Sequence, residues 1–183
     1  MTPDTAAAEL LAIARRRPPT LGGARLVCID GPAGSGKTTL AAAVAAAEPD
    51  ARVVHLDDLY DGWGGLPRVA EQLDDLLLPL ARGEVGSYRR YDWVAEAFAE
   101  TVPVEPVPLL VLEGVGCGTR RHADLVTALA WVEAPEEVRL RRGLDRDGEA
   151  LRPQWLRWQV DEAALFESDD TRARADLVVD TRQ

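Results

Sequence analysis

A glycine-rich segment places the strongest constraint on how this chain folds. Residues 31–38 read GPAGSGKT and match the pattern G-x-x-x-x-G-K-[ST] at every position. An apolar run, Arg25 to Asp30, precedes the segment, and an alanine- and leucine-rich run, Lys37 to Ala47, follows it, so a buried strand and then a helix are predicted. Strand, glycine-rich turn and helix in this order form a phosphate-binding loop, because backbone N–H groups and the helix N-terminus point at the anion.

Apolar and amphipathic segments alternate along the rest of the chain. Further strands are predicted at Arg52 to Leu56, Leu109 to Glu113, Ala130 to Glu133 and Leu177 to Asp180, and further helices at Thr5 to Arg17, Pro67 to Leu80, Pro135 to Leu144 and Pro153 to Phe166. This alternation predicts an α/β fold of the P-loop NTPase class, with a doubly wound, five-stranded parallel sheet and helices on both faces. The length of 183 residues suits one such domain, in which residues 1–20 form an N-terminal helix and linker.

Composition limits the partners and the compartment. The 21 basic and 31 acidic residues give a formal charge of −10, which would repel a nucleic-acid backbone. Two cysteines do not make a disulfide framework, so we expect a cytoplasmic protein. The first residues lack a positively charged leader, and no apolar run is long enough to span a membrane. Monomer and dimer both remain open.

The glycine-rich segment supplies the predicted nucleotide contacts. Lys37 should reach the β- and γ-phosphates of ATP or GTP, and Thr38 should bind Mg²⁺. The full set of predicted nucleotide-binding residues is Gly31, Ala33, Gly34, Ser35, Gly36, Lys37, Thr38 and Thr39.

Carboxylates follow two of the predicted strands. Asp57 and Asp58 come after the second strand and Glu113 closes the third, where strand carboxyl ends face the ligand crevice. Asp57 could accept a proton from an attacking hydroxyl or hold a metal-bound water, and Glu113 resembles the acid expected near Mg²⁺. The alternatives are an ordinary acidic loop or a helix cap for the two aspartates, and a surface glutamate at a strand end for Glu113.

Cations and aromatic side chains complete the predicted site. Arginines crowd residues 139–152, where a lid carrying Arg142 and Arg146 would cover the phosphates, unless neighbouring acids pair with them. Residues 83–108 are polar and punctuated by proline, so they predict a long surface loop, and loops of this length are usually functional. Aromatic residues in this loop and in residues 57–65 either stack on an acceptor or pack the flank: Tyr60, Trp63, Tyr88, Tyr91 and Trp93. We expect Trp155 and Trp158 to pack against the sheet, and we assign no role to His55 or His122.

These residues, in their order along the chain, resemble the uridine-cytidine kinase family of P-loop kinases, which is related to phosphoribulokinase and pantothenate kinase. The resemblance spans Arg25 to Asp180 and rests on the phosphate loop, on HLDDLY at residues 55–60, YDW at 91–93, LEG at 112–114, RLRR at 139–142, RD at 146–147 and ADLVV at 175–179. It implies the strand order 2-3-1-4-5 and the role of catalytic base for Asp57. It also implies acceptor contacts from Tyr91 and Asp92, and lid arginines at Arg142 and Arg146.

The sequence departs from the family in the acceptor segment. There the Tyr-Asp pair is followed by a histidine and an arginine that hold the nucleoside, whereas this chain has Glu96 and Phe98. The chain is also shorter than typical members, which predicts little room for their β-hairpin. We therefore expect an Mg²⁺- and ATP-dependent phosphotransferase acting on a hydroxyl of a small molecule, with uridine or cytidine among the candidates. Asp58, Tyr60, Tyr91, Asp92 and Trp93 are the predicted acceptor contacts. The alternatives are an ATPase or nucleotide-dependent switch, and an ATP-binding protein without catalysis.

Overall fold

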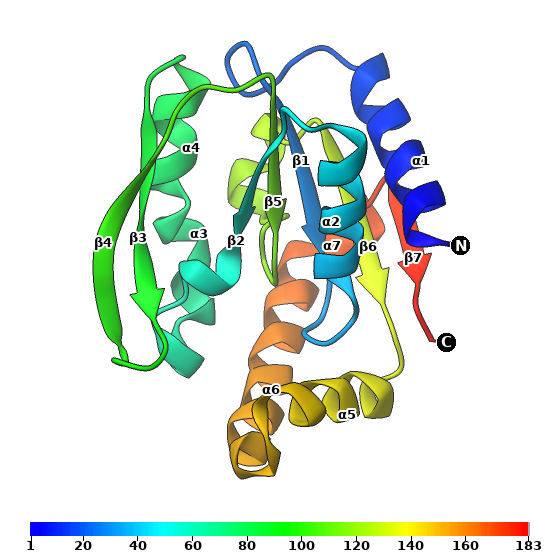
Figure 1. Cartoon of the computed structure of the whole chain (residues 1–183), viewed down its shortest axis with the longest axis vertical. Helices are drawn as coiled ribbons and strands as arrows, with labels where there is room; N and C mark the ends of the chain where they lie inside the picture. The colour runs from blue at the N-terminus through cyan, green and yellow to red at the C-terminus, as the bar shows by residue number, and fades with distance from the viewer. Residues whose placement is uncertain (183) are drawn as a thin grey trace.

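A parallel five-stranded sheet forms the centre of the computed structural model, which describes residues 1–182 (Figure 1). Its strands are β2 (Arg52–His55), β5 (Leu109–Glu113), β1 (Arg25–Asp30), β6 (Ala128–Glu133) and β7 (Leu177–Asp180), in that spatial order. Counted along the chain without the antiparallel pair described below, this is the order 2-3-1-4-5, as predicted. In Figure 1 the arrows of β1, β6 and β7 point to the end of the molecule where α5 lies.

Helices cover both faces of the sheet. α1 (Pro3–Arg16) and α2 (Lys37–Ala47) pack together on one face. On the other face lie α3 (Val69–Gln72), α4 (Asp74–Ala81) and α6 (Arg152–Asp169), while α5 (Glu136–Asp147) and α7 (Thr171–Arg174) flank α6. Short 3₁₀ turns connect these elements: η1 (Leu56–Asp58), η2 (Gly62–Gly64), η3 (Leu66–Arg68), η4 (Arg120–Leu125) and η5 (Glu149–Leu151). The predicted α/β architecture is confirmed.

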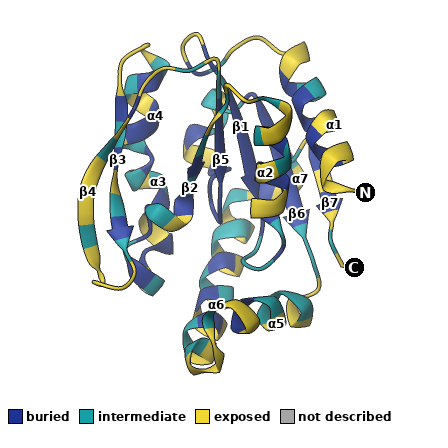
Figure 2. Ribbon diagram, viewed as in Figure 1, coloured by how far each residue is buried: buried dark blue, intermediate teal, exposed yellow. Residues whose placement is uncertain are grey.

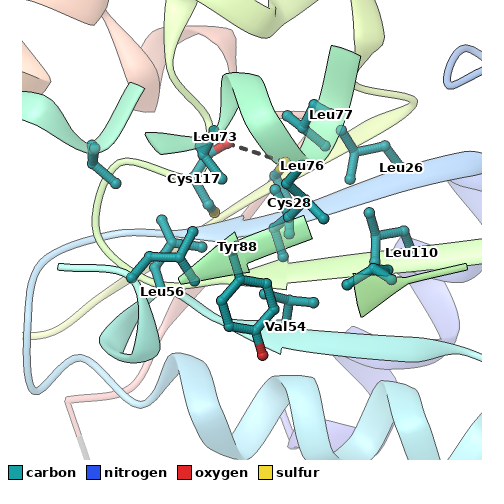
Figure 3. Close-up of a cluster of buried hydrophobic side chains, with 14 of the residues drawn as sticks. Leu26, Cys28, Val54, Leu56, Leu73, Leu76, Leu77, Tyr88, Leu110 and Cys117 are labelled. Carbon is teal, nitrogen blue, oxygen red and sulfur yellow. Dashed lines mark hydrogen bonds between the residues drawn. The ribbon is translucent and has the colours of Figure 1, made fainter. Parts of the chain in front are cut away.

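Strand β1 buries side chains against the helices on both faces of the sheet. Leu26 and Cys28 point into the cluster beneath α4 and α6, whereas Val27 and Ile29 point into the cluster beneath α1 and α2. All four side chains are fully buried, and Figure 2 shows the central strands as the most buried part of the molecule. Figure 3 shows the first cluster, in which the Cys28 thiol donates a hydrogen bond of 3.3 Å to the Cys117 carbonyl oxygen. A continuous apolar run on a strand is therefore explained by burial on both faces.

The prediction for residues 83–108 was wrong, because this stretch is an antiparallel β-hairpin. β3 (Gly86–Asp92) pairs with β4 (Ala97–Val104), and β3 packs against α4. The register shifts between Arg89 and Tyr91, so Tyr88 and Tyr91 are both buried although they are three positions apart, an odd number that would place them on opposite faces of a regular strand. A bulge of this kind breaks the alternation by which a strand is recognised in sequence. The expectation that the chain has little room for a β-hairpin is also wrong.

Several element boundaries differ from the sequence prediction. The helix expected from Pro67 to Leu80 is divided at Leu73 into α3 and α4, after the turn η3. Leu56 belongs to η1, which begins directly after the carboxyl end of β2, rather than to the preceding strand. Within residues 1–182, no helix is both long enough and apolar enough to cross a bilayer.

Candidate functional site

The loop between β1 and α2 has the geometry of a phosphate cradle. Gly31, Gly34 and Gly36 have φ values of 138°, 76° and 99°, which favour glycine. A Cβ at Gly31 would collide with the Val132 carbonyl oxygen, and one at Gly34 would collide with the Arg139 backbone. Within the described residues, the N–H groups of Gly34, Gly36 and Lys37 make no hydrogen bond. Free N–H groups at the N-terminus of α2 fit a bound phosphate.

Two buried carboxylates hold this loop in place, and sequence reasoning missed both. Asp30, fully buried at the end of β1, accepts hydrogen bonds from the N–H groups of Gly31 (2.7 Å), Gly116 (2.8 Å) and Gly118 (2.7 Å). Glu162 on α6 accepts one from the Ala33 N–H at 2.8 Å. The sequence signal for Asp30 was a charged residue ending an otherwise apolar strand. Glu162 gave no such signal, because acidic residues are common on helix surfaces.

Burial raises the pKa of Asp30 to about 6, although the three N–H donors act in the opposite direction. Because the folded chain holds this proton more tightly than the unfolded chain, the contribution to stability is present at low pH and lost as pH rises through about 6. We expect the free energy of unfolding to fall between pH 4 and pH 7 by roughly 3 kcal/mol more in the wild type than in Asp30→Asn. Urea denaturation at several pH values measures this difference. Parallel pH curves for the two proteins would contradict the prediction.

Lys37, Thr38 and Glu113 meet at the base of the loop. Lys37 is 6% exposed, and its ammonium donates to the Pro32 carbonyl oxygen at 3.0 Å. The Thr38 hydroxyl donates to Glu113 Oε2 at 3.3 Å. In the β1–β5 pairing, Glu113 lies beside Ile29. Ile29 is followed by Asp30, the last residue of β1 before the phosphate loop. The fold thus brings the predicted Mg²⁺-binding threonine and glutamate together.

His55 also belongs to this group, although no role was predicted for it. It pairs with Glu113 in the β2–β5 register, and its Nδ1 lies 2.7 Å from Glu113 Oε2. This hydrogen bond is the main reason why the pKa of His55 lies above its ordinary value. The spacing of residues in the sequence could not reveal this pair, because the two residues are 58 positions apart.

Asp57 lies in η1, at the carboxyl end of β2, and its side chain is reachable by water. The walls of a cavity nevertheless surround it and raise its pKa above the ordinary value, and the negative charge of Glu113 adds to the rise. Lys37, Arg146 and His55 act in the opposite direction. A carboxylate with a raised pKa beside a phosphate cradle is suited to accept a proton.

Protein side chains alone do not form a metal site here. Among the described residues, no three His, Cys, Asp or Glu side chains lie close enough together to hold a metal ion. Magnesium is commonly bound by one or two protein ligands together with substrate phosphates and water. The hydrogen-bonded pair of Thr38 and Glu113, next to the phosphate cradle, fits an ion of that kind.

A cavity of about 810 Å³ extends from the phosphate loop to the β-hairpin. The predicted residues that line it are Ala33, Gly34, Gly36, Lys37, Thr38, Asp57, Asp58, Tyr60, Trp93, Glu113, Arg142 and Arg146. Trp63, Glu96, Trp155 and Trp158 line it as well. We call its end beside the hairpin the acceptor chamber, defined by Asp57, Asp58, Trp63, Trp93, Glu96 and Trp155.

Some residues that were predicted to contact the acceptor instead make structural contacts around the chamber. Tyr60 is 1% exposed, and its hydroxyl donates to the Val115 carbonyl oxygen at 2.8 Å, so its wall position is fixed. Tyr91 and Asp92 do not line the cavity. Tyr91 packs edge-on against Trp93, with ring centroids 5.3 Å apart. The Asp92 carboxylate accepts from the N–H groups of Val94 and Ala95, both at 2.9 Å, and thereby closes the hairpin turn.

The predicted lid arginines lie at the phosphate end. Arg142 donates to the Thr181 carbonyl oxygen at 2.7 Å and to the Gly34 carbonyl oxygen at 3.3 Å. Arg146 donates a hydrogen bond to the Asp147 carboxylate at 2.7 Å, and its guanidinium lies over the Trp155 ring. Arg139 instead pairs with Glu162 at 2.7 Å and so helps to hold the loop. The region expected as a lid consists of the end of α5, η5 and the first residue of α6.

A second cavity, of about 650 Å³, lies on the other side of Gly36. Its lining combines apolar side chains with polar groups from the end of β7 and from α5: Met1, Pro3, Thr39, Leu40, Val132, Arg142, Val179, Asp180, Thr181 and Arg182. Gly36 and Arg142 line both cavities, so the phosphate loop lies between them.

Known structures show the same architecture. No family model matches the sequence, and a search of curated proteins found no significant match. A candidate fructose transport system kinase from Silicibacter sp. TM1040 superposes with a TM-score of 0.70 at 24% identity, covering 97% of this chain and 98% of that chain. A possible uridine kinase from Bacillus stearothermophilus gives a TM-score of 0.67 at 19% identity, with 97% of both chains covered. This chain has the fold of the P-loop kinases.

More distant kinases share this fold as well. D-glycerate 3-kinase from Cryptococcus neoformans gives a TM-score of 0.59 at 14% identity, covering 91% of this chain and 89% of that chain. The names of these three proteins differ, and they refer to uridine, to a fructose transport system and to D-glycerate. At these identities the likeness establishes the fold, and the acceptor has to be argued from the cavity of this chain.

Proposed function

We propose that this protein transfers the γ-phosphoryl group of Mg-ATP to a hydroxyl group of a small molecule. The observation that carries the proposal is the position of Asp57, which lines one cavity together with Lys37 of the phosphate loop and the aromatic acceptor chamber. A base between a phosphate cradle and a chamber of this size suits phosphoryl transfer to a bound acceptor.

The nucleotide would span both cavities. Its phosphates would lie on the free N–H groups of the loop and beside Lys37, and its base would occupy the second cavity next to Thr39 and Arg142. Thr38 and Glu113 would hold Mg²⁺, which neutralises charge on the phosphate oxygens when it is bound. Arg146 would add positive charge from α5 on the opposite wall.

The transfer step follows from this placement. The acceptor oxygen forms a bond to the γ-phosphorus, the bond from that phosphorus to the bridging oxygen breaks, and ADP leaves with the electron pair. Asp57 takes the proton of the hydroxyl group. Its raised pKa brings it closer to neutral pH, which favours both acceptance and later release of that proton.

A coupled assay of ADP release tests the proposal. Mg-ATP is supplied with a panel of nucleosides, nucleotides, sugars, amino alcohols and hydroxy acids, and the Lys37→Ala variant controls for contaminating kinases. We expect at least one compound to raise ADP release well above basal hydrolysis in the wild type and not in the variant. ATP binding without any acceptor-dependent turnover would reject the proposal and favour a nucleotide-dependent switch or an ATP-binding protein without catalysis.

A further inference from the structure

The wall of the acceptor chamber that is built by residues 57–96 carries unpaired carboxylates. Asp57, Asp58 and Glu96 all line the cavity, and among the described residues none of the three has an arginine or lysine within ion-pair distance. The cations that line the same cavity are Lys37, Arg142 and Arg146, which come from the phosphate loop and α5. The part of the wall built by residues 57–96 therefore contributes carboxylates and no cation.

Nearby cations on the hairpin are already engaged. Arg90 pairs with Glu100 at 2.7 Å and lies 3.9 Å from Asp92, and Arg89 lies over the Phe98 ring. His55 is hydrogen-bonded to Glu113 at 2.7 Å. An anionic acceptor placed beside Asp58 and Glu96 would thus be repelled by carboxylates that have no ion-paired cation, while Lys37 and Arg146 oppose this charge only on the side of Asp57 and Trp155.

Tryptophan rings form the remaining walls. Trp63 stands edge-on to Trp93 at 5.7 Å and to Trp155 at 6.1 Å between ring centroids. The Trp93 indole N–H donates to the Asp57 carbonyl oxygen at 2.8 Å, which fixes this ring beside the proposed base. Ring faces attract cations, most strongly when carboxylates stand nearby and water is displaced.

A fourth tryptophan, Trp158, lines the cavity as well. It is 4% exposed, and within the described part of the chain its indole N–H is buried and has no hydrogen-bond partner. Because this N–H is not accessible, Trp158 contributes to the wall through the carbon atoms of its ring and extends the aromatic surface.

We propose that the phosphoryl acceptor is a cationic hydroxyl compound, an amino alcohol or amino sugar whose ammonium group lies between the tryptophan faces and the carboxylates of Asp58 and Glu96. This proposal rests on the proposed function, because it assumes that Asp57 receives the acceptor hydroxyl. We expect Glu96 to determine the charge preference, because it lines the cavity and forms no ion pair among the described residues.

Matched compounds test the proposal. Glucosamine and 2-aminoethanol are compared with their neutral N-acetyl derivatives and with the anion glycerate, in ADP release and in binding followed by tryptophan fluorescence. We expect kcat/KM and affinity to favour the amines over the N-acetyl compounds by at least about 10-fold. Glu96→Gln should abolish most of this preference, while Glu105→Gln, an equal charge change at an exposed position outside the cavity, should retain it.

The two readouts separate the possible failures. A neutral or anionic compound preferred in both readouts would overturn the cationic acceptor and leave the kinase proposal standing. Amine binding that depends on Glu96, without acceptor-dependent ADP release, would support the cationic ligand and reject the transfer reaction. If no amine binds or is turned over, the cationic acceptor is rejected.

Discussion

Replacing Asp57 by asparagine is expected to lower acceptor-dependent turnover by about 10²- to 10⁴-fold, the usual contribution of a general base. The amide keeps the size of the side chain but cannot take the hydroxyl proton. Folding should change little, because Asp57 is open to water and forms no ion pair among the described residues. ATP affinity should be retained, since the phosphate cradle is built from other residues. Steady-state kinetics and titration with a fluorescent ATP analogue measure the two effects separately.

The pH profile distinguishes a base from a purely electrostatic group. Since the pKa of Asp57 is raised, the wild type should lose kcat/KM on the acid side at a pH above the ordinary range of an aspartate. The Asp57→Asn variant should not show this decrease of kcat/KM at acid pH. Asp124→Asn, at an exposed position away from the cavity, should still show it. Turnover close to that of the wild type in Asp57→Asn would rule out the assignment as base.

A magnesium titration decides the other role left open for Asp57. If the carboxylate holds the ion or its water, Asp57→Asn should raise the Mg²⁺ concentration required for half-maximal ATP binding. If Asp57 acts as the base alone, that concentration should stay unchanged while turnover falls. Glu113→Gln provides the comparison, because Glu113 is the carboxylate that contacts Thr38.

The sheet and its phosphate loop could be predicted because each signal is local. Apolar runs, the glycine positions and the helix that follows them depend on neighbouring residues, and the strand order followed from the family resemblance. Asp57 and Glu113 could be placed at the same edge because parallel strands end together. The placement of these two residues depends only on where each predicted strand ends, and the sequence indicates that position.

The remaining parts depend on contacts between distant segments. The bulge between Arg89 and Tyr91 shifts the strand register, so the hairpin looked like a polar loop. His55 and Glu162 become site residues only through partners 58 and 129 positions away, on β5 and on the phosphate loop. Tyr60 was expected to contact the acceptor, but its hydroxyl donates to the Val115 carbonyl oxygen, 55 positions away along the chain. The pattern of residues in a single sequence does not indicate contacts between positions that are so far apart.

Replacing Lys37 by alanine is expected to lower turnover by about 10²- to 10³-fold, the usual cost of removing one group that stabilises charge in the transition state. Nucleotide affinity should fall as well, because Lys37 is predicted to contact the β- and γ-phosphates in the ground state. The fold should survive, because within the described residues the Lys37 ammonium forms one hydrogen bond, to the Pro32 carbonyl oxygen. Arg16→Ala, which removes an exposed charge on α1, is the matched control.

The sequence allows a chemical test of the same residue, because Lys37 is its single lysine. An amine-directed reagent should label the wild type at Lys37 and at the terminal amine, and labelling at Lys37 should inactivate the enzyme. Mg-ATP should protect this site, whereas the acceptor alone should not, since the ammonium lies on the phosphate side of the cavity. Mass spectrometry of the labelled peptide identifies the position. Labelling of Lys37 that leaves turnover intact would show that the transferred phosphoryl group does not depend on this ammonium.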